Sequence, residues 1–160
     1  MINPDVAAKF AVRKMCPADL EQVMAIAAGL KDAPHWPQSA YIAALDAGFS
    51  PRRIALVFAD AQSDSVAGFA VAILLPPQAE LESIGVRSHE QRKGIGSKLI
   101  GRLVHELRLA AVSELMLEVR ASNLAGIAFY QALGWSQSGV RPRYYADPEE
   151  DAILMSLSLG

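Results

Sequence analysis

The chain has 160 residues, which fits one domain, and 52% of them are apolar, enough to build a sizeable core. Its formal net charge of -2 argues against nucleic acid as a main partner, because phosphate backbones are bound through clustered Lys and Arg. The longest apolar run, Val66 to Pro77, is too short to span a bilayer, so we expect no membrane partner either.

The first third of the chain predicts one strand and two helices. Residues 10–14 alternate between apolar and polar and predict a strand. Pro17 suits the first position of a helix whose apolar residues recur at helical spacing up to Leu30. After a loop that contains Trp36, residues 39–47 predict a second short helix, which ends before Gly48.

The middle of the chain predicts three consecutive strands. Residues 53–59 and 66–75 are apolar runs separated by polar turn residues, a pattern typical of a hairpin. Residues 79–86 follow the Pro76-Pro77 break and predict the third strand. Short connections make consecutive strands antiparallel, so this part predicts an antiparallel sheet.

The second half of the chain predicts alternating helices and strands. Residues 94–109 carry an apolar stripe and predict a helix, and residues 114–119 predict a strand. Asn123 suits the N-cap of a helix that runs to Leu133, with Gly134 as its C-cap, and strands at 135–140 and 152–157 close the chain. This order predicts an α/β fold: a mixed, mostly antiparallel sheet of about six or seven strands with helices on both faces.

A glycine-containing loop joins the strand ending at Val86 to the helix from residue 94. Glycines allow close approach of the backbone to a ligand, and the free N–H groups of a helix start bind phosphate. Two basic side chains add positive charge, so the loop suits a pyrophosphate. Its residues are Gln91, Arg92, Lys93, Gly94, Ile95, Gly96 and Ser97. The Walker pattern is absent, and a dinucleotide fingerprint would need glycine where Leu99 stands.

The remaining pattern, Gln/Arg-x-x-Gly-x-Gly/Ala after a strand ending in Val, resembles the signature of GNAT acetyltransferases. Two further motifs, Leu117 to Tyr130 and Arg141 to Tyr145, resemble in particular the bacterial GNAT family that acetylates the N-terminal alanine of a ribosomal protein. The resemblance runs from about Ala79 to Leu157. It implies the GNAT fold, acetyl-CoA as cosubstrate and a protein N-terminus as acceptor, with the N-terminal alanine of a small-subunit ribosomal protein as the expected one.

Acetyl transfer from a thioester needs bound CoA, a neutral amine, a stabilised oxyanion and a proton for the departing thiolate. We expect the backbone of Ile84, Gly85 and Val86 to pair with the pantetheine, with one N–H facing the oxyanion. The resemblance assigns a CoA contact to Asn123, and a CoA contact is also expected for Tyr130.

The resemblance assigns the general base to Glu118 and the general acid to Tyr130. Alternation along the strand places Glu118 on the face opposite Leu117, in agreement with an exposed base. A weak base is enough for an α-amine, whose pKa of ~8 is far below the ~10.4 of lysine. Glu80 and Glu82, on the strand beside the cofactor, remain rival bases, because the resemblance to other GNAT enzymes implies a base on that strand.

An aromatic acceptor slot is predicted from Trp36, Arg141, Tyr144 and Tyr145, because Tyr and Trp give rigid contact area with a polar tip. The acidic residues that follow, from Asp147 to Asp151, are expected to form a solvated turn and could also steer a basic tail.

The histidines, the single cysteine and the first residues bear on metal binding and cellular location. His35, His89 and His105 lack metal-ligand spacing, so no metal site is expected. Cys16 is the only cysteine and cannot form an internal disulfide, which fits a reducing cytoplasm. Residues 1–5 lack the features of a signal peptide, so a cytoplasmic protein is expected.

Two alternative functions remain open at this point. A GNAT enzyme could instead acetylate a lysine side chain or a small-molecule amine. A chain of another class would bind CoA without turnover, as a sensor or partner module. The presence of both Glu118 and Tyr130 argues against a binding module without turnover. Trp36 and the tyrosine pair argue against a lysine or small-amine acceptor.

Overall fold

The computed structural model describes residues 9–160, and the expectation about residues 1–5 lies outside this range. One seven-stranded sheet forms the centre of the fold, with strand order β1-β2-β3-β4-β5-β7-β6. The strands are β1 (Phe10–Lys14), β2 (Arg53–Asp60), β3 (Val66–Leu75), β4 (Gln78–Val86), β5 (Glu114–Arg120), β6 (Ser136–Ala146) and β7 (Glu149–Ser158). The helices are α2 (Leu20–Ala28), α3 (Gln38–Leu45), α4 (Ile95–Leu109) and α5 (Leu124–Ala132), with 3-10 turns at Pro17–Asp19 and Ser88–Glu90. The predicted fold class is confirmed.

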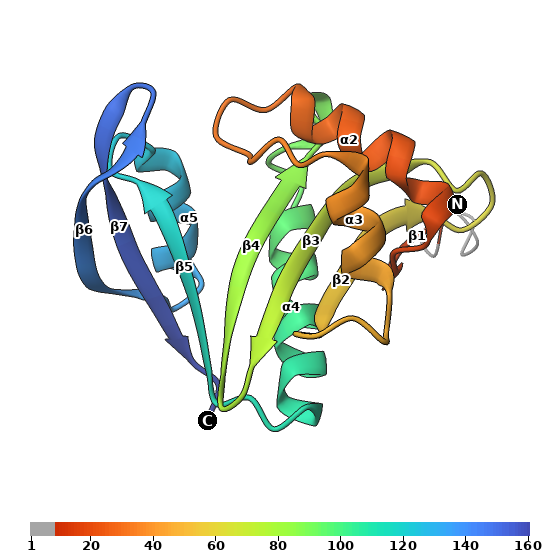
Figure 1. Ribbon diagram of the computed structural model, residues 1–160. Helices are drawn as coiled ribbons and strands as arrows, with labels where there is room; N and C mark the ends of the chain where they lie inside the picture. The colour runs from red at the N-terminus through yellow and green to blue at the C-terminus, as the bar shows by residue number, and fades with distance from the viewer. Residues whose placement is uncertain (1–8) are drawn as a thin grey trace, which may run out of the picture.

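Helices cover both faces of the sheet, and each face has its own core (Figure 1). Helix α4 buries the stripe Ile95, Leu99, Leu103 and Leu107 against one face, together with α5. Gly68 on β3 makes this close packing possible, because a Cβ there would lie 3.1 Å from the Ile95 side chain. Helices α2 and α3 pack against the other face, called here the α2/α3 face.

The sheet opens between β4 and β5, its parallel neighbours. They pair through three residue pairs, from Gln78↔Glu114 to Glu80↔Met116, and then diverge (Figure 1). A bulge in β4 accompanies this separation: Val71 of β3 pairs with Ser83, and the next residue, Ala72, pairs with Leu81. The extra residue, Glu82, reverses the alternation, so that Ser83 and Gly85 share the α2/α3 face with their partners on β3.

Helix α5 begins at the predicted N-cap. The Gly126 N–H donates to Asn123 Oδ1 at 2.9 Å, which satisfies one of the free donors of the first turn. A Cβ at position 126 would lie 2.6 Å from the Asn123 amide nitrogen, so glycine is needed at this position. Gly134 follows the helix with φ +95°, a left-handed conformation that ends helices.

The last hairpin is longer than the sequence predicts. Strand β6 extends to Ala146 instead of Val140, and β7 begins at Glu149 instead of Ala152. Pro142 is tolerated because β6 is an edge strand. The β6–β7 register shifts between Arg141 and Tyr145, where Arg143 adopts a left-handed φ of 54°. Most of the acidic stretch therefore belongs to a strand and not to a turn.

Candidate active site

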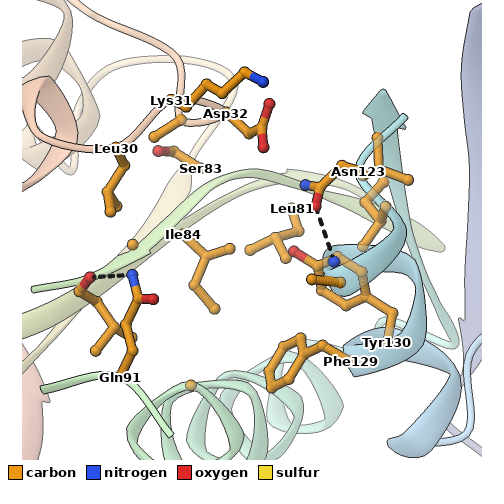
Figure 2. A pocket seen from close by; sticks show the side chains of 18 of the residues that line it. Leu30, Lys31, Asp32, Leu81, Ser83, Ile84, Gln91, Asn123, Phe129 and Tyr130 are labelled. Carbon is orange, nitrogen blue, oxygen red and sulfur yellow. Dashed lines mark hydrogen bonds between the residues drawn. The ribbon is translucent and has the colours of Figure 1, made fainter. Parts of the chain in front are cut away.

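A cleft of about 760 Å³ lies where β4 and β5 separate. Its walls come from the α2–α3 loop, β4, the glycine loop with the start of α4, β5, α5 and the tip of the β6–β7 hairpin. Figure 2 shows Leu30, Lys31 and Asp32 on one side of β4, and Phe129 and Tyr130 on the other. The lining residues are 30–34, 81–86, 90–92, 94–97, 117–120, Asn123, Ala125, Gly126, Phe129, Tyr130 and Tyr145. The cleft therefore reaches both faces of the sheet.

The glycine loop forms one end of the cleft. Arg92 and Gly94 adopt left-handed φ values of 64° and 81°, which turn the chain just before the start of α4. The N-cap Gly94 offers no side chain to the first turn of α4, so the N–H groups of that turn have no capping partner. Lys93 is the one predicted loop residue that does not line the cleft; its exposed ammonium pairs with Glu90 at 3.0 Å.

The edge of β4 that faces β5 forms the cleft wall. Ile84, Gly85 and Val86 pair with β3 on one edge, and their other edge has no strand beside it because β5 has moved away. Gln91 folds back on this edge, its amide donating to the Val86 carbonyl at 3.1 Å. An unpaired strand edge offers alternating N–H and C=O groups to an extended ligand.

Glu118 and Tyr130 line the same cleft from opposite faces of the sheet. Leu117 and Val119 are buried in the α4/α5 core, so Glu118 points to the α2/α3 face. Tyr130 comes from α5, is only 8% exposed, and packs its ring on Phe129 and Trp135. Burial raises the pKa of Tyr130 to about 12, so its phenol stays protonated at neutral pH.

Of the three candidate carboxylates, Glu118 is the best placed. Glu82 lines the cleft, but its two oxygens accept from Arg53 at 2.7 and 3.3 Å. Glu80 does not line the cleft. Its pKa is raised above the usual range, first by burial and then by the charges of Glu118 and Glu82. Glu118 is free of such a bidentate clamp; one oxygen pairs with Arg141 at 3.3 Å.

Three of the four predicted acceptor residues gather near Glu118. Tyr145 lines the cleft, and Tyr144 packs edge-on against it with ring centroids 5.0 Å apart. A hydrogen bond to Glu118, reinforced by the charge of that carboxylate, raises the pKa of Tyr144. Arg141 lies over the Tyr144 ring at 5.1 Å. Trp36 does not line the cleft; it is half-buried and packs on Tyr41, against the core of the α2/α3 face.

Two lining residues, Leu30 and Phe129, were not among the predicted site residues. Leu30 touches the cleft at Gly85, where a Cβ would lie 2.8 Å from the Leu30 Cδ1 atom. Phe129 faces Gly96 across the glycine loop, and a Cβ at Gly96 would lie 3.0 Å from its ring. Both contacts join segments far apart in the chain, so the sequence alone does not reveal them. The only sequence pattern that includes these residues is helical periodicity, which predicts them as core residues.

Other site types find no support in the residues that the structure describes. Within residues 9–160, no cluster of three or more His, Cys, Asp or Glu is arranged to hold a metal ion. The helices of the same range are all too short or too polar to cross a membrane.

Comparison with known proteins agrees with this geometry. The acetyltransferase (GNAT) family model matches residues 20–135. The Escherichia coli K12 [ribosomal protein bS18]-alanine N-acetyltransferase is 41% identical over 101 residues, which cover 62% of this chain and 68% of the relative. The Salmonella typhimurium protein of the same name is 42% identical over 99 residues, which cover 61% and 67%.

Solved structures show the same likeness over nearly the whole fold. The ribosomal-protein-S18-alanine N-acetyltransferase from Escherichia coli superposes with a TM-score of 0.81 at 31% identity, covering 94% of each chain. Ard1 from Thermoplasma volcanium superposes with a TM-score of 0.80 at 26% identity, covering 94% of this chain and 97% of its own. The chain therefore belongs to the acetyltransferase (GNAT) family and is an acetyl-CoA-dependent N-acetyltransferase.

Proposed function

We propose that the chain transfers the acetyl group of acetyl-CoA to a protein N-terminal α-amine, that of the N-terminal alanine of a small-subunit ribosomal protein. The observation that carries the proposal is the placement of Glu118 and Tyr130 in one cleft, on opposite faces of the opened sheet. The names of the relatives support the choice of acceptor. Such an acceptor is synthesised in the cytoplasm, where we place the enzyme.

Acetyl-CoA binds along the β4 side of the cleft in this proposal. The pyrophosphate lies on the first turn of α4, where uncapped N–H groups and the positive end of the helix dipole favour an anion. The pantetheine pairs with the unpaired edge of Ile84, Gly85 and Val86, and one of their N–H groups faces the developing oxyanion. Asn123 Oδ1 is engaged in the helix cap, which leaves its amide nitrogen for CoA.

The acceptor amine attacks the thioester carbonyl from the α2/α3 face, where Glu118 lies. The C–N bond forms, the C–S bond breaks, and the amine loses one proton, which Glu118 collects directly or through a water. An α-amine with a pKa of ~8 needs little help, whereas lysine at ~10.4 would need a stronger base. Glu80, beside Glu118 and with a raised pKa, is the reserve base.

Tyr130 acts on the departing thiolate. The pKa of the Tyr130 phenol, about 12, exceeds the ~8.5 of a thiol. Complete proton transfer from the phenol to the thiolate is therefore energetically unfavourable. Its main contribution is therefore a hydrogen bond that strengthens as negative charge develops on sulfur. The proton that leaves the amine passes through Glu118 and solvent to the CoA thiolate, so the products are the amide and the free CoA thiol.

Tyr144, Tyr145 and Arg141 form the acceptor wall opposite the α2–α3 loop. Tyr145 supplies the cleft surface, and Tyr144 and Arg141 hold Glu118 from the hairpin side. We assign to Trp36 a supporting role: its packing on Tyr41 anchors the α2–α3 loop that forms the facing wall.

Gly96→Asp is expected to abolish the rise in melting temperature that acetyl-CoA produces. A ligand that binds only the native state stabilises it by mass action. The aspartate adds negative charge at the phosphate position and crowds Phe129. Thermal unfolding with and without acetyl-CoA measures the effect. Gly101→Asp is the matched control, since it adds the same charge to α4 where a Cβ meets open space. An undiminished shift in Gly96→Asp would remove the loop from the cofactor site.

The acceptor is tested with two peptides of equal sequence, each with an internal lysine, one with a free N-terminal alanine and the other with a blocked N-terminus. We expect acetylation of the free α-amine alone, read by mass spectrometry. The same assay separates the alternatives. Efficient labelling of the internal lysine in the blocked peptide would indicate a lysine or small-amine acetyltransferase, and acetyl-CoA binding without any turnover would indicate a binding module.

A further inference from the structure

The tip of the β6–β7 hairpin projects beyond the strand that supports it. The β5–β7 ladder ends at Arg120↔Ala152, followed by one bond from the Ala121 N–H to the Asp151 carbonyl. Residues 144–150 therefore extend past the end of β5, and residues 146–149 are exposed. Because Tyr144 and Tyr145 belong to this tip, their position depends on side chains that reach out to it.

Arg120 is the side chain that reaches from β5 to the tip. Its guanidinium contacts Glu150 Oε1 at 3.0 Å, the Pro148 carbonyl at 3.2 Å and the Asp147 carbonyl at 3.5 Å. Ser122, just after β5, reinforces the contact through its hydroxyl, which donates to the same Glu150 oxygen at 3.0 Å. The pair is largely shielded from water, with 22% of the Arg120 and 18% of the Glu150 side chain exposed.

The same guanidinium covers the ring of Tyr145. The Arg120 Cζ atom lies 4.2 Å from the ring centroid, within the range of a cation–π contact. One planar guanidinium thus lies over the ring and also donates hydrogen bonds to the hairpin tip. Lysine has no such plane and cannot make both contacts at once. The contacts continue from Tyr145 to the ring of Tyr144, whose pKa Glu118 raises.

We propose that Arg120 is a positioning residue for the acceptor: with Glu150 it latches the hairpin tip onto the end of β5 and so fixes Tyr145 as a wall of the acceptor slot. The proposal rests on the acceptor assignment made above. The CoA contacts proposed above come from β4, the start of α4, and Asn123 and Tyr130 at α5. Arg120 also lines the cleft, but the side-chain contacts described here run to the hairpin tip and not to these groups. The latch therefore governs acceptor binding and leaves acetyl-CoA binding unchanged.

Steady-state kinetics with the free N-terminal peptide test the latch. Arg120→Lys is expected to raise KM for the peptide about ten-fold, about 1.4 kcal/mol of binding, with kcat within about three-fold of wild type. Glu150→Gln should raise the same KM, and the double variant should be no worse than the poorer single variant, because both substitutions break one latch. The melting shift with acetyl-CoA reports in each variant that the fold and cofactor site are intact.

Arg102→Lys is the matched control, because Arg102 forms an exposed ion pair with Glu106 on α4. Its KM should equal that of the wild type. An unchanged peptide KM in both Arg120→Lys and Glu150→Gln would overturn the latch, and so would a loss confined to kcat or to acetyl-CoA binding. A wild-type enzyme that acetylates no free α-amine would instead overturn the proposed function, so the two failures are distinguishable.

Discussion

Tyr130→Phe is expected to lower kcat about 100-fold or more, with acetyl-CoA binding almost unchanged. The substitution removes a hydroxyl used mainly in the transition state, and the ring keeps its packing on Phe129 and Trp135. The pKa of about 12 makes the phenol a donor at every pH below that value. The loss should therefore be constant between pH 6 and pH 10. Single-turnover rates and calorimetric titration with acetyl-CoA separate the two quantities.

Tyr41→Phe is the matched control for this substitution. Tyr41 is also buried, and its hydroxyl has no hydrogen-bond partner among the residues that the structure describes. It lies in the core of the α2/α3 face and does not line the cleft. Its kcat should stay at the wild-type level. A Tyr130→Phe enzyme with wild-type kcat would show that Tyr130 has only a packing role.

Glu118→Gln is expected to lose most activity at low pH: about 100-fold at pH 6 and less than about ten-fold at pH 9. An acceptor α-amine with a pKa of ~8 is almost entirely protonated at pH 6 and mostly neutral at pH 9. The wild-type carboxylate collects the proton of the bound ammonium, whereas the amide variant must wait for the neutral amine. The pH profile of kcat/KM, measured with a free N-terminal peptide, should rise more steeply in the variant.

Glu80→Gln is the companion variant, because Glu80 lies near enough for the Glu118 charge to raise its pKa. We expect a much smaller loss from it, with no added pH dependence. If Glu118→Gln keeps the wild-type profile and Glu80→Gln acquires the steep one, the base is Glu80. Glu118→Gln also weakens the contacts to Arg141 and Tyr144, and the peptide KM reports that separate effect.

The sequence predicts the elements well where local periodicity decides them. The stripe on α4 and the Asn123 cap needed no tertiary information, and both are present. The last hairpin was predicted too short, because Pro142 and the exposed polar residues around it look like a strand end. An edge strand tolerates a proline and a shift in register. The sequence pattern of one strand does not show that it will lie at the edge of the sheet or that its register will shift.

The site was predictable to the extent that single motifs describe it. The glycine loop and the positions of Glu118 and Tyr130 follow from short segments, and the structure brings them to one cleft. The Arg53–Glu82 ion pair and the Trp36–Tyr41 contact are tertiary. The first engages both oxygens of Glu82, a rival base, and the second packs Trp36, an expected acceptor contact, against the core of the α2/α3 face. The bulge at Glu82 could not be predicted either, because it interrupts the strict alternation of inward and outward residues on which strand prediction relies.

The opening between β4 and β5 has a kinetic consequence. It passes through the sheet, with the α2–α3 loop at one mouth and α5 at the other, so two molecules can approach from opposite sides. Neither has to leave before the other arrives. The acetyl group can then pass directly from CoA to the amine, with no covalent acyl-enzyme intermediate. Double-reciprocal plots of initial rates, at several fixed concentrations of one substrate, should therefore intersect instead of running parallel.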